Sequence, residues 1–230
     1  MKFAIIADIH ANLEALRSVL EDASVQNCAH HAFLGDFVGY CADPKACIDI
    51  IRALNAPCVK GNYDDYCASN LTSDLTSAAK RAAEWTRNQL TEDDRRWLHD
   101  LPYFRKVENF TIVHATLNQP ERWGYVFEKG AAAASFAHQD TDICFFGHTH
   151  VPVAFIRDTI VRGGTYTKFK IKPGAQYFVN PGSVGQPRDK NRDAAAYVTY
   201  DIEKRTIELR RVIFDAATTQ RKIRESGLGK

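Results

Sequence analysis

Two histidines stand two positions apart at the end of an apolar run, in the stretch FFGHTH that covers residues 145–150. The preceding run from Asp142 to Phe146 is typical of a short buried strand, and Gly147 permits the backbone turn that ends it. Residues i and i+2 of an extended chain point to the same side, so His148 and His150 can aim at one point. The pair is either a metal-binding pair or two polar loop residues, and the rest of the chain must decide.

Similar polar residues follow other strand-like runs, always at the carboxyl end. The full set comprises Asp8, His10, Asp36, Asn62, His114, His148 and His150. Each residue alone could be a cap or turn residue, but that explanation gives no reason for oxygen and nitrogen donors to collect at strand ends. In open α/β sheets ligands bind at this edge. The sequence therefore predicts one shared metal site. The other histidines lack this placement and are expected on the surface or in packing; they are His30, His31, His99 and His138.

The first part of the chain alternates strand-like and helix-like segments. Strands are predicted at KFAIIAD (2–8), HAFLGD (31–36) and APCVKGN (56–62), and helices at 12–25 and 43–54. Asp43 is a candidate N-cap, followed by Pro44 at the first helical position. Such alternation predicts a parallel sheet with right-handed crossovers.

The later part has a different character. Residues 71–101 are expected to be helical, with a break where Thr91 can cap a second helix. A hairpin is expected at 103–115 and a helix at 130–140, and the remaining strands alternate with period two, as in antiparallel sheets. A polar helix closes the chain. The sequence predicts a single α/β domain over residues 1–230, with two stacked sheets flanked by helices.

Composition excludes several classes of protein. The chain has 230 residues, 45% of them hydrophobic, with 30 basic and 28 acidic side chains and a formal charge of +2. This balance gives no basic surface for a nucleic acid or a membrane as the main partner. The N-terminal apolar run is too short for a signal peptide, and no run reaches the roughly 18 apolar residues of a membrane span.

The cysteines point to a reducing compartment. The six cysteines show no Cys-x-x-Cys spacing, which argues against a zinc or disulfide framework. We therefore expect reduced, buried thiols in a cytoplasmic protein. The sequence leaves the oligomeric state open, including a homo-oligomer.

Five short blocks in order resemble a known family. DIHAN, GDFVGY, GNYD, VHAT and GHTH are similar to the blocks of the calcineurin-like metallophosphoesterases. The later stretch NPGSVGQPRD resembles the small prokaryotic branch with phosphodiesterases and Ap4A hydrolases. The resemblance runs from Asp8 to about Arg188 and implies a four-layer α/β/β/α sandwich with two stacked mixed sheets.

The resemblance also implies a division of the ligands between two ions. Asp8, His10 and His150 would hold one metal, Asn62, His114 and His148 the other, and Asp36 would bridge them. Oxygen and imidazole donors without thiolate suit two divalent transition-metal ions, Mn²⁺, Fe²⁺, Zn²⁺ or Ni²⁺. In such centres a metal-bound hydroxide attacks the phosphorus.

The third block departs from the pattern of many family members. They carry a histidine after Gly-Asn that helps to protonate the leaving oxygen, whereas this chain has Tyr63. Without that histidine, an alkoxide leaving group lacks its proton donor, whereas a phosphate, pyrophosphate or aryloxide leaving group hardly needs to be protonated. The substitution favours phosphodiesters and nucleotide anhydrides. Alternatively, Tyr63 only packs near the site and another residue supplies the proton.

We assign site roles accordingly. Catalytic roles are predicted for Asp36, Asn62, His114 and Tyr63, and substrate contacts for Asn12, Tyr63 and Arg188. Arg188 follows a glycine-rich turn whose amides could face the phosphate, although a solvated loop arginine is an alternative. Asn12 could also support the first metal block by hydrogen bonding or cap a helix. Lysines 168, 170 and 172 are expected on a solvated strand face.

The predicted function is a dinuclear metal-dependent phosphoesterase acting on a small phosphorylated substrate, such as a phosphodiester or a dinucleoside polyphosphate like Ap4A. Neither a membrane nor a stable nucleic-acid partner is expected. Two alternatives remain: a phosphoprotein phosphatase, and a non-catalytic scaffold resembling the retromer subunit of this fold. The absence of the third-block histidine argues against the first, and the complete ligand set against the second.

Overall fold

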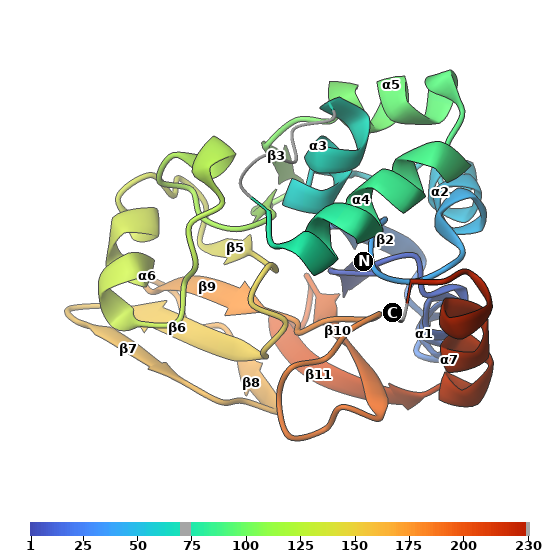
Figure 1. Cartoon of the computed structure of the whole chain (residues 1–230). Coiled ribbons are helices and arrows are strands. Elements are labelled where there is room, and N and C mark those ends of the chain that lie inside the picture. Colours follow the sequence, from blue (N-terminus) through green and yellow to red (C-terminus); the bar gives the residue numbers. More distant parts are fainter. Residues whose placement is uncertain (70–74, 229–230) are drawn as a thin grey trace.

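Two mixed β-sheets form the centre of the molecule in this computed structural model, which describes residues 1–69 and 75–228 (Figure 1). Within those ranges one sheet has five strands in the order β2-β1-β10-β11-β8, and the other has six in the order β3-β4-β5-β9-β6-β7. The first sheet contains β1 (Lys2–Ile6), β2 (His30–Phe33), β8 (Lys168–Lys170), β10 (Ala194–Asp201) and β11 (Thr206–Ile213). The second contains β3 (Phe104–Val107), β4 (Phe110–Val113), β5 (Ile143–Phe145), β6 (Val153–Arg157), β7 (Val161–Gly164) and β9 (Gln176–Asn180).

Pairing is parallel for β1 with β2 and for β4, β5 and β9, and antiparallel elsewhere. The predicted pair of mixed sheets is confirmed. The parallel sheet expected in the first part is correct for β1 and β2 only, because β1 takes the antiparallel β10 as its other neighbour.

Helices cover the outer faces of both sheets. They are α1 (Leu13–Val25), α2 (Pro44–Ala53), α3 (Asn62–Ser69), α4 (Ser77–Gln89), α5 (Glu92–Asp100), the 3₁₀ turn η1 (Pro120–Arg122), α6 (Lys129–Phe136) and α7 (Ala216–Glu225). In Figure 1, α6 lies on one flank of the molecule, and α1 and α7 lie together on the other.

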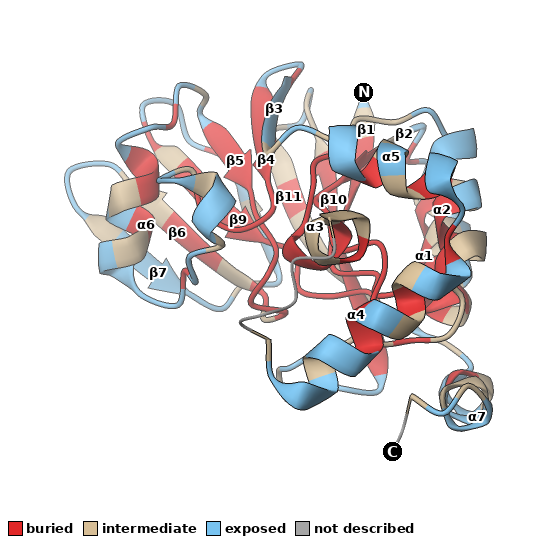
Figure 2. Cartoon of the chain, turned by 45° about the horizontal axis from the view of Figure 1, so that its top comes forward, coloured by how far each residue is buried: buried red, intermediate tan, exposed pale blue. Residues whose placement is uncertain are grey.

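Alternate side chains of a strand face opposite sides of its sheet, and the buried ones form three apolar layers. In β1 and the residue after it, Phe3, Ile5 and Ala7 face the core between the two sheets, while Ala4 and Ile6 face α1 and α2. The second sheet repeats this division, because Ile143 and Phe145 face the inter-sheet core and Cys144 packs towards α6. Successive side chains of a strand point to opposite faces, so a strand buried on both sides is apolar throughout. Figure 2 shows these buried positions in the strands and on the inner helix faces. The four-layer α/β/β/α sandwich is confirmed.

The third predicted strand is wrong. Residues 56–62 make only an isolated parallel bridge between Phe33 and Cys58. The pairing stops there because the groups that would continue it bind elsewhere: the Gly35 carbonyl accepts the N–H of Asp8 at 3.1 Å, and the Gly61 N–H donates to Asp64 Oδ2 at 2.9 Å. The chain then enters α3 at Asn62, a helix the sequence pattern did not predict. Asn62 therefore occupies a helix start instead of a strand end.

The helix ends agree with some of the local predictions and differ from others. Thr91 caps α5 in a reciprocal capping box with Asp94, as predicted. Asp43 precedes Pro44 at the start of α2 but makes no capping bond, and its carboxylate binds Lys222 instead. The predicted helix from 130 to 140 ends at Phe136. Positions 71–74 of the helical prediction lie outside the described residues.

Three other expectations concern cysteines, lysines and membrane spans. All six cysteines are free and buried. Lys168 and Lys170 are exposed on β8, as expected for a solvated face. Across residues 1–69 and 75–228, no helix has the length and apolar character needed to cross a lipid bilayer.

Candidate metal centre

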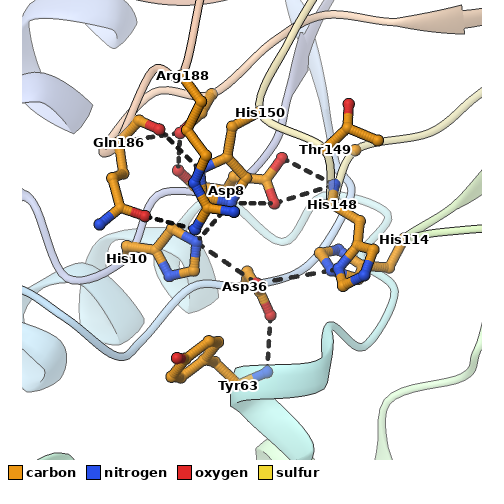
Figure 3. Close-up of polar contacts among 12 residues, drawn as sticks. Asp8, His10, Asp36, Tyr63, His114, His148, Thr149, His150, Gln186 and Arg188 are labelled. Carbon is orange, nitrogen blue, oxygen red and sulfur yellow. Dashed lines mark hydrogen bonds and ion pairs between the residues drawn. The ribbon is translucent and has the colours of Figure 1, made fainter. Parts of the chain in front are cut away.

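The seven predicted ligands lie together at one end of the sheets, although they come from five separate segments. Figure 3 labels six of them, all except Asn62. Asp8 and His10 follow β1, Asp36 follows β2, Asn62 begins α3, His114 follows β4, and His148 and His150 follow β5. All are buried. Asp36 occupies the middle, with its Oδ2 atom 3.4 Å from His10 Nε2 and 3.5 Å from His114 Nε2.

Two groups of donor atoms share Asp36. In the first, His10 Nε2 lies 3.1 Å from His150 Nε2, which lies 3.5 Å from Asp8 Oδ1. The ligand atoms of Asp8, His10, Asp36 and His150 all lie within 4.8 Å of one another. In the second, His114 Nε2 lies 3.0 Å from Asn62 Oδ1 and 3.2 Å from His148 Nδ1.

Backbone carbonyls fix which imidazole nitrogens face the centre. The Nδ1 atoms of His10, His114 and His150 lie 3.2, 2.8 and 2.7 Å from the carbonyl oxygens of Val38, Leu34 and Gln186. A carbonyl can only accept, so each Nδ1 carries the proton and each Nε2 of a neutral ring presents a lone pair. The contact between His10 Nε2 and His150 Nε2 then joins two lone pairs. A shared cation removes this repulsion, and the Nδ1 bonds are those that orient metal-bound imidazoles.

The charges of the site also fit bound cations. Burial raises the pKa of Asp8 well above its ordinary value, helped by the Asp36 carboxylate, and burial raises the pKa of Asp36 to about 7. Burial lowers the pKa of His114 to about 4 and that of His148 to about 2, so these rings are neutral at pH 7 and free to act as ligands. Divalent cations would stabilise the ionised carboxylates and bind the neutral imidazoles. The donor set therefore fits divalent metal ions.

Backbone strain is concentrated at the same residues. Asp8, His10, Asp36, His148 and His150 all have positive φ, between 50° and 66°. Few residues other than glycine adopt this left-handed region, and each such case costs about 1–3 kcal/mol. Strained conformations of this kind persist where surrounding contacts enforce them, and they are frequent at functional sites.

Asp64 holds the Asp36 loop against the start of α3. It is fully buried, and its carboxylate accepts the backbone N–H groups of Asp36 (2.8 Å), Phe37 (2.8 Å) and Gly61 (2.9 Å). The two loops approach so closely that a Cβ atom on Gly61 would lie 2.2 Å from the nitrogen of Asp36. Only glycine fits there. Asp64 is the last residue of the GNYD block, but its role cannot be read from the sequence.

The NPGSVGQPRD segment supports the ligand loops from behind. Asn180 donates to the carbonyl of Gly147 at 2.6 Å, and Ser183 donates to that of Asp8 at 2.8 Å. The expectation that the amides of the glycine-rich turn face a phosphate is not supported. Val184 and Gly185 donate their N–H groups to the carbonyl oxygens of Ala7 and Asp8.

Asn12 lies behind the site. Its Oδ1 atom caps α1 by accepting the N–H of Ala15, and its Nδ2 atom donates to the carbonyl of Gly185 at 3.1 Å. The side chain is only 1% exposed. This geometry fits the predicted capping and supporting roles, and it does not support a contact between Asn12 and the substrate.

Tyr63 packs beside the first donor group. Its ring meets that of His10 edge-on at 5.4 Å and lies 4.5 Å from the ring of Tyr40, and its N–H donates to Asp36 Oδ1. Burial, together with a hydrogen bond to Tyr40, raises the pKa of Tyr63. The phenol is therefore protonated at neutral pH. Figure 3 shows Tyr63 beneath Asp36, on the side opposite Arg188.

A cleft of about 380 Å³ opens over the ligands. Its lining includes Asp36, Asn62, His148 and His150, the predicted contacts Tyr63 and Arg188, and several aromatic residues that the sequence did not single out: Tyr40, Tyr66, Trp123 and Tyr125. Arg188 is exposed, and its guanidinium donates to Gln186 Oε1 at 2.7 Å. Tyr40 ends the GDFVGY block, whereas Tyr66, Trp123 and Tyr125 belong to no block and no periodic pattern, so the sequence carries no signal for them.

Comparison with known proteins gives a consistent result. A family model described as a calcineurin-like phosphoesterase superfamily domain matches residues 1–205. An uncharacterized protein of Methanocaldococcus jannaschii is 33% identical over 227 residues, which cover 96% of this chain and 90% of that protein. A metallophosphoesterase from Sphaerobacter thermophilus is 33% identical with a TM-score of 0.86, covering 99% of this chain and 94% of that one. A hypothetical protein from Pyrococcus horikoshii OT3 has the same fold, with a TM-score of 0.81, 18% identity and coverage of 99% and 94%.

Proposed function

The chain belongs to the calcineurin-like phosphoesterase superfamily, and we propose that it hydrolyses small phosphodiesters or nucleotide phosphoanhydrides with two divalent transition-metal ions. Membership supports a metal-dependent phosphoester hydrolase. The two-ion centre, the substrate class and the residue roles below are our proposals.

One observation carries the two-ion proposal: Asp36 Oδ2 lies within 3.5 Å of Nε2 atoms from two different donor groups. Asp8, His10 and His150 would hold one ion. Asn62, His114 and His148 would hold the other, and Asp36 would contact both. Carboxylate, amide and imidazole donors without thiolate suit Mn²⁺, Fe²⁺, Zn²⁺ or Ni²⁺. Bound ions would supply Lewis-acid stabilisation of phosphoryl charge and activation of water.

The protein side chains bind and orient the substrate. The Arg188 guanidinium lines the cleft, and its planar donors suit two phosphate oxygens at once. Asp36, held by the N–H of Tyr63 at 2.8 Å, keeps the two donor groups in register. Tyr63 keeps its proton at neutral pH, so its hydroxyl can donate a hydrogen bond.

The proton donors that line the cleft favour a substrate whose leaving group does not need to be protonated. The histidines that line it, within the described parts of the chain, are His148 and His150, and both are proposed ligands. No imidazole is then left there to protonate a leaving alkoxide. Phosphodiesters with acidic leaving groups and phosphoanhydrides need no such proton, because their leaving groups are already stable anions. Alkyl monophosphates are accordingly poor substrates.

The test uses purified protein reconstituted with each candidate metal. We expect elemental analysis to give two ions per chain and a substrate screen to show hydrolysis of aryl phosphodiesters or dinucleoside polyphosphates, with little on alkyl monophosphates. Asp36→Asn should abolish turnover. Asp49→Asn is a matched control, because Asp49 is 55% exposed, pairs with Lys45 and does not line the cleft.

The same screen separates the alternatives. Preferential hydrolysis of phosphopeptides would favour a phosphoprotein phosphatase. A folded protein that binds metal but cleaves nothing would favour a non-catalytic scaffold. Asp36→Asn with wild-type turnover would refute the shared role of Asp36.

We also propose a cytoplasmic location and a small phosphorylated molecule as the main partner. The six free, buried cysteines are in keeping with a reducing compartment. Fractionation of the native host would test the location.

A further inference from the structure

Aromatic side chains wall the cleft beyond the metal centre. Tyr40 and Tyr66 approach from the loop after β2 and from α3, and Trp123 and Tyr125 from the segment after η1. The cleft of about 380 Å³ is in the range of small-molecule sites. A phosphate group over the ligands occupies only part of it, so the rest of the substrate must contact the aromatic walls.

The segment that carries Trp123 and Tyr125 joins these walls directly to the metal ligands. The Tyr125 ring stacks on that of His148, with centroids 4.2 Å apart at 29°. Trp123 meets His114 edge-on at 5.8 Å. Tyr125 is nevertheless 53% exposed, and its other ring contact, Phe127, is 61% exposed. Large exposed aromatic groups beside a functional site are typical of ligand-binding surfaces.

The segment is held in a strained backbone conformation. Both residues that flank η1, Gln119 and Trp123, have φ of 55°. Positive φ is a genuine outlier for a residue as bulky as tryptophan, and such strain is concentrated at ligand clamps and active sites. The strain therefore supports a role for the Trp123 position in binding.

Positive charge lines the same cleft. Arg122 and Arg188 both contribute to its lining. Among the residues that the structure describes, no carboxylate forms an ion pair with either guanidinium. A ligand with more than one phosphate can use both groups, in addition to the cations proposed at the centre.

We propose that this cleft binds the nucleobase of a nucleotide substrate, with the base against Trp123 and Tyr125 and the phosphates between Arg188 and the metal centre. The flat face of a nucleobase stacks on aromatic side chains whichever base it is. A lipid chain would not use the arginines, and a bare sugar phosphate would leave the aromatic walls unused. The inference rests on the proposed phosphoesterase function for the identity of the reacting group.

Binding, measured apart from turnover, tests the proposal. The probes are adenosine 5′-monophosphate and ribose 5-phosphate, which share sugar and phosphate and differ by the base. Dissociation constants are measured by calorimetry on manganese-loaded protein. Stacking predicts that wild type binds the adenine nucleotide roughly 5- to 150-fold more tightly. Trp123→Leu and Tyr125→Leu should each reduce this ratio several-fold and leave binding of ribose 5-phosphate nearly unchanged. Tyr125→Phe, which keeps the ring, should retain most of the ratio.

Two controls make the outcome specific. Phe104→Leu removes an aromatic side chain of similar exposure, 51%, on β3 outside the cleft, and should leave the ratio unchanged. Metal content of each variant is measured, so that damage to His148 or His114 is seen directly. A wild-type ratio near one overturns the inference, as does a ratio that both cleft variants leave intact. If the protein hydrolyses simple diesters but binds the two probes with an affinity ratio near one, only the base site is refuted. If binding depends on the base but no substrate is hydrolysed, only the proposed activity is refuted.

Discussion

Replacing Asp64 with asparagine should destabilise the protein and weaken its metal site, although Asp64 is not a proposed ligand. Its Oδ2 atom accepts the N–H groups of Asp36 and Gly61, and its Oδ1 atom accepts that of Phe37. Burial, together with the Asp36 carboxylate, raises the pKa of Asp64 well above its ordinary value, although the three N–H donors act to lower it. Hydrogen bonds from three N–H groups favour the charged form, and cations bound beside Asp36 would favour it further, so we expect an ionised Asp64 in the metal-loaded protein.

The size of the effect follows from these contacts. The new asparagine side chain has two orientations. In the better one its carboxamide oxygen takes the position of Oδ2 and keeps two hydrogen bonds, and its NH₂ group faces the N–H of Phe37. One buried N–H without an acceptor costs about 1–3 kcal/mol. For a chain of this size each kcal/mol lowers Tm by about 2–4 °C, so a decrease of roughly 2–12 °C is expected. Because Asp64 positions Asp36, metal affinity should fall about 10- to 100-fold.

The assay is thermal unfolding by calorimetry, in chelator and at saturating metal, with metal affinity measured separately. Asp49→Asn is the control, because it removes a surface carboxylate that is 55% exposed, and should change stability by less than about 0.5 kcal/mol. Wild-type Tm and metal affinity in Asp64→Asn would refute the bracing role of the three N–H bonds.

Three further predictions concern metal, leaving group and pH. Chelation should abolish hydrolysis and lower Tm, since metal at 100 times its Kd stabilises the folded state by about 2.7 kcal/mol; an unchanged melting curve would contradict tight binding to the folded protein. Tyr63→His should raise kcat/KM on substrates with alkoxide leaving groups, by at most roughly 10²–10⁴-fold, while Tyr63→Phe slows good-leaving-group diesters modestly. Equal loss from Tyr63→Phe across a graded leaving-group series would instead identify Tyr63 as the acid. Burial acts to raise the pKa of Asp22, but hydrogen bonds from Arg210 and Tyr197 outweigh it and lower the pKa. The stability from Asp22 is therefore present above its unfolded pKa of about 3.9 and is lost as pH falls through the lower folded value. Denaturant unfolding should show Asp22→Asn less stable than wild type at pH 7, with a smaller difference at pH 3; a constant difference would refute this linkage.

The candidate metal-site residues could be named from the sequence because their signals are local. Asp8 and His10, like His148 and His150, occur two apart after apolar runs, and such spacing places two side chains in one loop. The block resemblance supplied the order and the partners. Strand alternation was equally informative, because residues facing the two sides of β1 and β5 had to be apolar in a four-layer sandwich.

Local patterns failed where a distant segment decided the outcome. Residues 56–62 have the composition of a strand, yet the N–H of Asp8 occupies the carbonyl of Gly35 and the ladder stops after one bridge. Asp43 looks like a helix cap, yet Lys222, 179 residues away, takes its carboxylate. Asn12 is a candidate substrate contact in the sequence, whereas in the structure its amide donates to the carbonyl of Gly185.

The sequence alone determined the family, the layer architecture and the identity of the candidate ligands, because those depend on residue type and on spacing along the chain. Only the tertiary structure decided that Asp64 braces the Asp36 loop and that Trp123 and Tyr125 share a cleft with Tyr66. These residues lie on segments far apart in sequence, with no periodicity to connect them. Their proximity follows from how two sheets and their helices pack, and a one-dimensional pattern does not record that.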